Sequence, residues 1–452
     1  MLHEKKTISS EEKKLKIKNL EITLEKKLQQ LHPKKIDLSL GRINKLLYKL
    51  GSPQKKIKNI IHIAGTNGKG SVLAFLKSFI KASGFTVNTY TSPHLINFNE
   101  RINLNGRSIS DKFLEFLLDI CNKKNNGKPI TFFEMTTAAA FLAFKKKPAD
   151  FTILETGLGG RLDATNIIKK PIVTIINEIS IDHTNFLGSN IKQIAKEKAG
   201  IIKKNSPLIV GKQKKETLKI IKKIANNLKA KTFFYKKNWF IKKNKKENNI
   251  IFFNNIKNNK KEKYPQPGLI GDHQVINAGI ALKAFNLIMK EKVNKNFIKN
   301  GLKNVQWPGR LQKIHLNKKL FSKKINHKNW EFWFDGGHNK SASKVLAKTF
   351  KTWHGKKLYI IFGMLNSKDP KDFLNYFKNV TAKLITVSIK SDSPYYPNKK
   401  LYEIAKLNEF NVETAQNIRH AIRKLLLNES PGQILICGSL YMYKEVSKLL
   451  KK

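Results

Sequence analysis

The stretch "IAGTNGKGS" at positions 63–71 constrains the fold of this chain more than any other. It is similar to the phosphate-binding pattern G-x-x-x-x-G-K-[ST], except that a glycine separates Lys69 from the hydroxyl residue Ser71. A short apolar run at 57–64 precedes the glycines, and apolar residues recur at helical spacing after them. With the next apolar run, 85–92, the order of elements predicts a βαβ unit whose helix N-terminus binds phosphate.

Apolar strands and helical patterns alternate along the rest of the chain in two series. This alternation predicts an α/β protein with mostly parallel sheets. We expect a P-loop-type ATP-binding domain over residues 1–305 and a Rossmann-like C-terminal domain over residues 306–452. The Lys/Asn-rich stretch 236–262 is expected to form a peripheral hairpin with solvated loops.

The formal net charge of +56 is unusually high. Such an excess is typical of proteins that contact nucleic-acid phosphates. Lysine and asparagine are abundant along the whole chain, however, and arginine, which nucleic-acid binders use for bidentate contacts, is scarce. We therefore interpret the charge as a compositional bias and expect no nucleic-acid partner. A basic nucleic-acid-binding protein remains the alternative hypothesis.

Several features predict a soluble, cytoplasmic protein without a membrane partner. No apolar run reaches the roughly 18 residues of a transmembrane helix. The charged N-terminal stretch lacks the apolar centre of a signal peptide. The cysteines, Cys121 and Cys437, lie far apart and show no metal-binding spacing, so both are expected to be free thiols.

Polar residues follow several of the predicted strands. Ser92 is the last residue of the run 85–92, Glu155 ends the strand 151–155, and His183 comes after an apolar strand that starts at Ile172. The carboxyl ends of parallel strands meet at one edge of a sheet, where ligands gather. Hydroxyl and carboxylate oxygens suit magnesium, so a magnesium site is predicted beside the phosphate loop. On residue chemistry alone, two readings of His183 are equally favoured: a magnesium ligand, or a histidine that lies in the core or supports a ligand.

Other candidate residues are less distinctive by themselves. The segment "IAKEKAGIIK" contains Lys196 and Lys198, and in a chain this rich in lysine we expect a solvated helical face. Arg310 lies near the predicted domain junction, and Asp335 follows a strand of the second series. An arginine and an aspartate from a second domain could close over a nucleotide and contact its phosphate and ribose.

The motifs taken together resemble one family. In chain order they are "HIAGTNGKGS", "TSPHL", "NERI", "ETGLGGRLDATN", "DHTNFLG", "EKAGI", "HQVINA", "PGRLQ" and "DGGHN". This combination resembles the folylpolyglutamate synthases and dihydrofolate synthases, which are ATP-dependent amide ligases of the Mur-ligase type. The resemblance runs from about Arg42 to the C-terminus. It departs from the family at "DGGHN", where an alanine is commoner, and at "GMLNSKDP", which lacks an aspartate before "KD".

The resemblance implies roles for individual residues. It implies ATP contacts by Gly68, Lys69, Gly70, Ser71, Asn277, Arg310, Asp335 and His338. It implies ligation of magnesium, with two ions expected, by Ser92, Glu155 and His183. It implies pterin contacts by Phe133, Glu134, Leu162, Asp163 and Ala164. It also implies carbamylation of Lys198, which converts a cation into a magnesium-binding carboxylate, and catalytic roles for Lys69, Lys198 and His183.

The reaction implied by the resemblance is ATP-driven amide formation through an acyl phosphate. The substrates would be dihydropteroate, folates, L-glutamate and ATP, and the protein is expected to act as a monomer. Because the family's dihydropteroate-binding members carry the aspartate matched by Asp163, we expect both synthase activities. A peptidoglycan-precursor ligase is the alternative within the superfamily. The "LDATN" and "TSPHL" motifs argue against it, as does the short chain before the glycine loop, since a uridine-nucleotide site needs an additional N-terminal domain.

Overall fold

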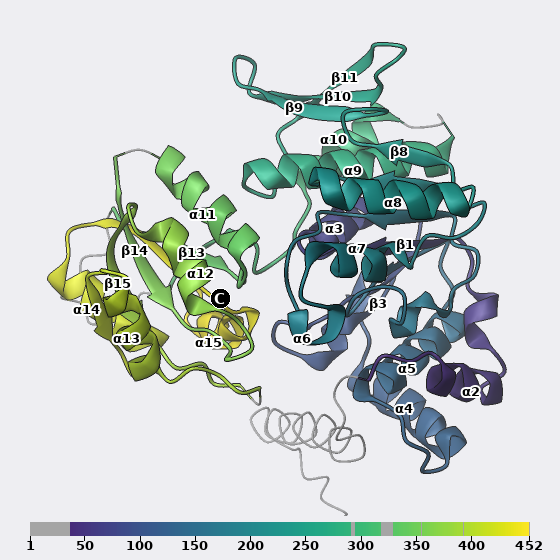
Figure 1. Cartoon of the computed structure of the whole chain (residues 1–452), viewed down its shortest axis with the longest axis horizontal. Helices are drawn as coiled ribbons and strands as arrows, with labels where there is room; N and C mark the ends of the chain where they lie inside the picture. The colour runs from purple at the N-terminus through teal and green to yellow at the C-terminus, as the bar shows by residue number, and fades with distance from the viewer. Residues whose placement is uncertain (1–36, 291–293, 318–328, 354, 392, 452) are drawn as a thin grey trace, which may run out of the picture.

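The protein contains two large sheets, each surrounded by helices, and a small antiparallel sheet at one end (Figure 1). The computed structural model describes residues 37–290, 294–317, 329–353, 355–391 and 393–451. The predicted first domain begins at residue 1, so its residues 1–36 lie outside the described part. The α/β class with mostly parallel sheets is confirmed. We propose the domain boundary near residue 305, in the segment that joins the helix ending at Lys303 to the second large sheet.

The first large sheet has eight strands in the order β4-β3-β2-β5-β1-β6-β7-β8. Along this order, β2, β5, β1, β6, β7 and β8 pair in parallel. The strands β3 and β4 pair in the antiparallel sense and form the edge beside β2. Since β5 and β6 flank β1, the loop after β1 lies at the middle of the carboxyl edge. The strands are β1 (Ile60–Ala64), β2 (Val87–Tyr90), β3 (Ile102–Leu104), β4 (Arg107–Ser108), β5 (Phe151–Glu155), β6 (Val173–Ile176), β7 (Leu208–Val210) and β8 (Thr232–Phe234).

Helices cover both faces of this sheet, because alternate residues of a strand point to opposite sides. Ile61 and Ile63 of β1 belong to a core formed with α3, α9 and α10, whereas Ile60 packs with α2, α4 and α5. The helices of this part are α2 (Gly41–Lys49), α3 (Lys69–Ala82), α4 (Asp111–Asn125), α5 (Phe132–Lys146), α6 (Thr184–Leu187), α7 (Ile191–Ala199), α8 (Lys215–Asn227), α9 (Asp272–Met289) and α10 (Lys295–Lys303).

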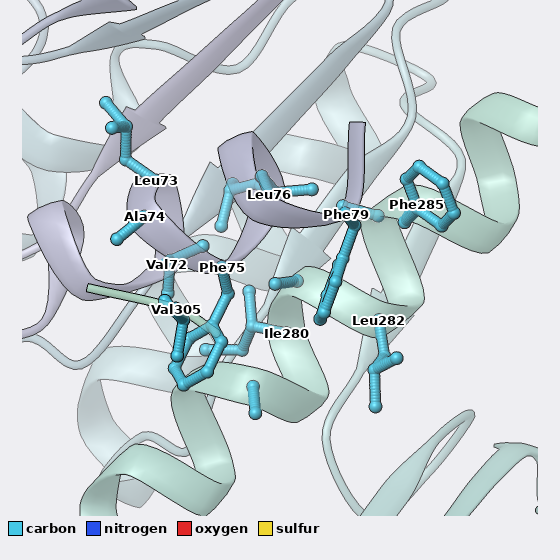
Figure 2. Packing of buried hydrophobic residues seen from close by; sticks show 14 of the residues in the cluster. Val72, Leu73, Ala74, Phe75, Leu76, Phe79, Ile280, Leu282, Phe285 and Val305 are labelled. Atoms are coloured by element: carbon cyan, nitrogen blue, oxygen red, sulfur yellow. The ribbon is translucent and has the colours of Figure 1, made fainter. Parts of the chain in front are cut away.

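The apolar repeat after the glycine loop is the buried face of α3. Figure 2 shows Phe75 and Phe79 of α3 packed near Ile280 and Phe285 of α9. The rings of Phe79 and Phe285 lie 5.7 Å apart. Burying such side chains contributes roughly 1.5–3 kcal/mol each. The helix that carries the phosphate loop is therefore fixed rigidly between the sheet and α9.

The Lys/Asn-rich stretch contains more structure than the predicted hairpin. It forms a three-stranded antiparallel sheet of β9 (Phe240–Asn244), β10 (Asn249–Asn255) and β11 (Lys260–Pro265). Ile241, Ile250 and Phe252 are buried in the same core as α9. The third strand was missed because its sequence, "KKEKYP", contains a single large apolar residue.

The second large sheet has six strands in the order β12-β13-β17-β14-β15-β16. All of its pairings are parallel except that of the edge strand β12. Its strands are β12 (Gln312–Ile314), β13 (Glu331–Asp335), β14 (Lys357–Phe362), β15 (Thr381–Thr386), β16 (Val412–Thr414) and β17 (Gly432–Cys437). Its helices are α11 (Lys340–Thr352), α12 (Pro370–Leu374), α13 (Asn398–Leu407), α14 (Ile418–Asn428) and α15 (Tyr443–Ser447).

The two cysteines are buried and free, as predicted. Burial raises the pKa of the Cys121 thiol to about 12, which makes it a poor nucleophile. Within the described ranges, no helix combines the length and the apolar character needed to cross a lipid bilayer.

Candidate functional site

The glycine loop lies where β1 ends and α3 begins. Gly68 precedes the helix with a φ of 78°, a left-handed conformation that glycine adopts without strain. A Cβ atom on Gly68 would lie 2.4 Å from the Asn177 side chain and 2.7 Å from Asn277 Oδ1. The loop therefore packs directly against Asn277, the sixth residue of α9. It presents the first turn of α3 at the sheet edge, an arrangement suited to phosphate.

Lys69 and Glu155 meet beside this loop. The Lys69 Nζ donates to two carbonyl oxygens of its own loop, at 3.1 and 3.4 Å, and lies 3.9 Å from Glu155 Oε1. Burial raises the pKa of Glu155, whereas the charges of Lys69 and Arg310 and the backbone N–H of Ser92 lower it. The predicted phosphate-binding lysine and two predicted magnesium ligands are thus neighbours in the structure.

His183 is not a core histidine, since 41% of its side chain is exposed. It precedes α6 in a left-handed conformation, and its backbone N–H donates to Asp182 Oδ1 at 2.8 Å. Partial burial lowers the pKa of His183 to about 4; the carboxylate of Asp182 opposes this shift, and the charge of Lys368 adds to it. The imidazole is therefore neutral at pH 7 and keeps a lone pair that a metal can use.

The residue types present fit a magnesium ion. Ser92, Glu155 and His183 supply a hydroxyl, a carboxylate and a neutral imidazole; Ser92 contacts Glu155, and Ser92 and His183 line one cavity. No group of three or more His, Cys, Asp or Glu side chains suited to a metal occurs in the described part of the chain. A magnesium ion here would keep waters and phosphate oxygens among its ligands, as this ion usually does.

Replacing Glu155 by Gln removes one charge at constant shape. We expect kcat/KM to fall at least about 100-fold, because charge held near the phosphates stabilises the transition state. ADP release would be measured over a range of Mg²⁺ and Mn²⁺ concentrations, and Mn²⁺ should rescue the activity only partly. The matched control is Glu216→Gln, at an exposed position of α8. An unchanged magnesium dependence of Glu155→Gln would exclude Glu155 as a ligand.

The expectation of a solvated face at "IAKEKAGIIK" is wrong for Lys198. Lys198 is 4% exposed, and its Nζ donates to the Gly65 carbonyl oxygen at 3.1 Å, whereas Lys196 is exposed. Burial, together with the charge of Lys69, lowers the pKa of Lys198 to about 7 against the opposing effect of nearby aspartates. An amine must lose its proton before it can add CO₂. Lys198 is chemically suited to carbamylation for that reason.

The second large sheet places Asp335 and Arg310 toward the same region. The Asp335 carboxylate accepts the backbone N–H of Leu311 at 2.7 Å and that of Gly337 at 2.6 Å. These bonds tie the end of β13 to the segment that carries Arg310, and Arg310 in turn lowers the pKa of Glu155. Asp335 thus shapes the turn that directs an arginine toward the metal site.

Asp182 lies among the candidate site residues, and the sequence analysis did not single it out. Its carboxylate accepts a hydrogen bond from Lys368 and another from Asn339 Nδ2 at 3.2 Å, and it lies 3.7 Å from His338 Nε2. Burial opposes ionisation, yet the nearby His338 and the charge of Lys368 hold the pKa of Asp182 well below its usual range. Two of these partners lie 157 and 186 positions away in sequence, so no local pattern could have revealed the contact.

A cavity of about 390 Å³ lies next to these groups and is lined by residues of both large parts of the protein. The predicted pterin residues that line it are Phe133, Glu134, Leu162, Asp163 and Ala164. Predicted metal and ATP residues also line it, namely Ser92, His183 and His338. The second part of the chain adds Leu365, Ser367, Lys368, Gly438, Ser439, Leu440 and Tyr441. Predicted residues outside this lining, such as Lys69, Lys198 and Asn277, gather around the glycine loop.

The two carboxylates of this cavity, Asp163 and Glu134, differ in whether their oxygens can accept a further hydrogen bond. Asp163 Oδ2 accepts the backbone N–H groups of Gly157 and Leu158, and Oδ1 accepts both the N–H and the hydroxyl of Thr165. These four bonds use the capacity of a carboxylate. Glu134 Oε2 accepts bonds from Arg42 and from a backbone N–H, but its Oε1 is buried without a partner among the described residues.

Arg101 lines the cavity and was not predicted as a site residue, although it belongs to the "NERI" motif. Its guanidinium lies 5.2 Å from the centre of the Phe98 ring and 5.7 Å from that of Phe132. Its Nε lies 3.1 Å from His94 Nδ1, and burial lowers the pKa of His94 to about 3, so the imidazole is neutral and accepts. The scarcity of arginine in this chain was the signal that could have identified it.

Comparisons with known proteins agree with this geometry. The sequence model of the Mur ligase middle domain matches residues 63–285, and that of the dihydrofolate synthetase C-terminal domain matches residues 317–450. The dihydrofolate synthase/folylpolyglutamate synthase of Bacillus subtilis is 33% identical over 431 residues, which cover 91% of this chain and 95% of that protein. The chain belongs to the dihydrofolate synthase/folylpolyglutamate synthase family. It is therefore an ATP-dependent ligase.

Solved structures of this family share the fold. Escherichia coli FolC in complex with DHPP and ADP superposes with a TM-score of 0.83 at 28% identity, covering 94% of this chain and 96% of that one. The bifunctional Yersinia pestis enzyme with Mn, AMPPNP and L-glutamate bound gives a TM-score of 0.81 at 25% identity, covering 94% and 97%. The C-terminal match to a dihydrofolate synthetase domain also disfavours the peptidoglycan-precursor alternative.

Proposed function

We propose that this protein joins L-glutamate to dihydropteroate, forming dihydrofolate, and also extends folates with further glutamates, with ATP as the energy source. One observation carries the proposal: the predicted pterin residues and His183 line a single cavity that adjoins a phosphate loop. Relatives from Bacillus subtilis and Escherichia coli are named for both activities. The bound DHPP, ADP and L-glutamate of the solved relatives are ligands of the same kinds.

The chemistry that this arrangement supports is two successive displacements. The substrate carboxylate attacks the γ-phosphorus, the bond to ADP breaks, and an acyl phosphate forms. The glutamate amine then attacks the acyl carbon, the bond to phosphate breaks, and the amide forms as the amine loses a proton. No side-chain nucleophile is needed. Lys69, placed by the glycine loop, and Arg310, placed by the turn that Asp335 holds, offset the repulsion between carboxylate and triphosphate. Magnesium, when bound by Ser92, Glu155 and His183, supplies further charge neutralisation.

For the pterin we propose different roles for the two carboxylates of the cavity. The sequence analysis expected Asp163 to contact the pterin, but its oxygens already accept hydrogen bonds from the protein. We assign Asp163 to shaping the loop and Glu134, which also lines the cavity, to binding the pterin. Phe133, whose ring stacks on Tyr90 at 5.9 Å, provides an aromatic wall for the ring system.

The test is an ADP-release assay in which dihydropteroate and tetrahydrofolate are offered separately, each with glutamate and Mg²⁺. We expect release with both substrates and none when glutamate is left out. Use of tetrahydrofolate but never dihydropteroate would leave only the chain-extending activity. Release with neither, combined with salt-dependent binding of DNA, would favour the nucleic-acid alternative.

The Asp163→Ala variant should impair the dihydropteroate reaction more than the extension of tetrahydrofolate. The longer folate has additional anchors, whereas dihydropteroate depends on the loop that Asp163 holds through Gly157 and Leu158. The measurement is the ratio of kcat/KM for the two substrates. Asp111→Ala, at the exposed start of α4, is the control. Equal losses for both substrates would argue against a role in pterin recognition.

A further inference from the structure

His62 is a fully buried histidine in the middle of β1, three residues before the glycine loop. Its Nε2 lies 2.8 Å from Thr165 Oγ1, and its Nδ1 is buried with no partner in the described part of the chain. β1 is flanked by β5 and β6, so the backbone of His62 is held on both sides. Among the described residues, the imidazole therefore has a single polar contact. Its partner, Thr165, lies outside the sheet.

The direction of each hydrogen bond in this contact follows from counting protons. The Thr165 hydroxyl donates its only hydrogen to Asp163 Oδ1, which also accepts the backbone N–H of Thr165 and so acts as an acceptor. His62 must therefore donate from Nε2 to the Thr165 oxygen, which leaves Nδ1 as an unpaired acceptor. Burial lowers the pKa of His62 to about 3, so the ring is neutral at pH 7 and carries one N–H. The relay runs from His62 through Thr165 to Asp163.

The far end of the relay is the wall of the cavity. Asp163 Oδ2 accepts the backbone N–H of Gly157 at 2.8 Å and that of Leu158 at 2.9 Å, and both residues line the cavity. A Cβ atom on Gly157 would lie 2.5 Å from the Phe133 ring, so the loop sits directly on that aromatic side chain. A shift of the loop would change the space between Gly157 and Phe133.

We infer that His62 is a positioning residue for the pterin substrate: through Thr165 and Asp163 it holds the Gly157–Leu158 loop against Phe133. The identity of the substrate rests on the proposed function. The inference that His62 holds the loop does not depend on it. His62 touches no substrate itself. It fixes the pterin wall to β1, the same strand that ends in the phosphate loop, so the two halves of the site share one rigid support.

The kinetic test compares KM values for dihydropteroate and for ATP. His62→Leu and Thr165→Val should each raise the KM for dihydropteroate roughly tenfold, the effect of one lost hydrogen bond, and leave the KM for ATP within about twofold. His62→Gln keeps an N–H donor at similar reach and should restore most of the affinity. The double variant should be no worse than either single one, because both changes interrupt the same relay.

Thr174→Val is the matched control. Thr174 lies opposite His62 on β6 and is equally buried, but its hydroxyl donates to the Pro207 carbonyl oxygen at 3.2 Å. Its loss should leave both KM values unchanged. Equal rises in both KM values, additive effects in the double variant, or a His62→Gln variant no better than His62→Leu would overturn the inference.

Hydrogen–deuterium exchange tests the same inference without any substrate. In His62→Leu and Thr165→Val, the amides of residues 156–163 should exchange faster, while those of residues 65–71 should not change. If the amides of residues 156–163 exchanged at the same rate in the wild type and in both variants, the inference that His62 holds this loop would be overturned. If the wild type used no pterin substrate but the loop amides responded, the proposed function would fail and the positioning role of His62 would stand.

Discussion

Replacing Lys69 by Ala is expected to reduce ATP turnover at least about 1,000-fold, or about 4 kcal/mol of transition-state stabilisation. The Lys69 ammonium lies within the glycine loop, 3.9 Å from the buried carboxylate of Glu155, where the phosphate charges are expected to gather. No other side chain of the loop carries a positive charge. The measurement is ADP release with saturating pterin substrate, glutamate and Mg²⁺.

The fold of the Lys69→Ala variant should be intact, because Lys69 is the first residue of α3 and alanine favours helix. Its circular dichroism spectrum and Tm would be compared with those of the wild type. Lys123→Ala, an exposed position near the end of α4, serves as the control for removing a lysine. Wild-type ADP release by Lys69→Ala would refute the assignment of the loop to ATP phosphates.

Lys198→Ala should be essentially inactive, whereas Lys196→Ala should behave like the wild type. We propose that the neutral Lys198 Nζ adds CO₂, forming an N–C bond and losing a proton, so that an anionic carbamate replaces a buried amine. Its pKa of about 7 leaves about half of the amine unprotonated at neutral pH, as this addition requires. Activity would be measured in buffers depleted of or supplied with bicarbonate, and the modification would be sought by native mass spectrometry.

Chemical rescue distinguishes a carbamate on Lys198 that takes part in the reaction from a lysine that only supports the structure. Short carboxylates such as formate or acetate should partly restore the Lys198→Ala variant, because they replace the missing oxygens, and should not affect the Lys69→Ala variant. Bicarbonate should raise the activity of the wild type after depletion. Equal tolerance of substitution at Lys196 and Lys198 would contradict the proposal, as would a wild type that stays indifferent to bicarbonate.

Local sequence patterns predicted the central elements well and the edges of the sheets poorly. The strand before the glycine loop and the strand ending at Glu155 are short, mostly apolar runs, and the helix after the loop has a periodic apolar face, so each could be recognised alone. The edge strands β12 and β16 have three residues each and carry charged side chains, so neither shows a strand pattern. Their place in the sheet depends on pairing with neighbours distant in sequence.

The candidate site divides in the same way. Some features of the site belong to short segments of sequence: glycines that must take left-handed φ, a lysine at the start of a helix, and polar residues after strands. These features allowed the phosphate loop and Ser92, Glu155 and His183 to be predicted. The burial of Lys198 was not predictable, because a helix with lysines on several faces does not reveal which face the protein covers. The filled acceptors of Asp163 were equally hidden, although their donors lie close in sequence.

The sequence by itself determined the α/β class, the phosphate loop and the family, because backbone conformation and side-chain periodicity are local properties and the motif order can be read directly. The tertiary structure alone decided the directions in which the pKa values of Lys198, His183 and Asp182 shift, and it decided that the oxygens of Asp163 are occupied by the protein. The physical reason is that a pKa depends on desolvation and on nearby charges. For Asp182, those charges come in part from Lys368, which is 186 positions away and is brought close only by the packing of the two large sheets.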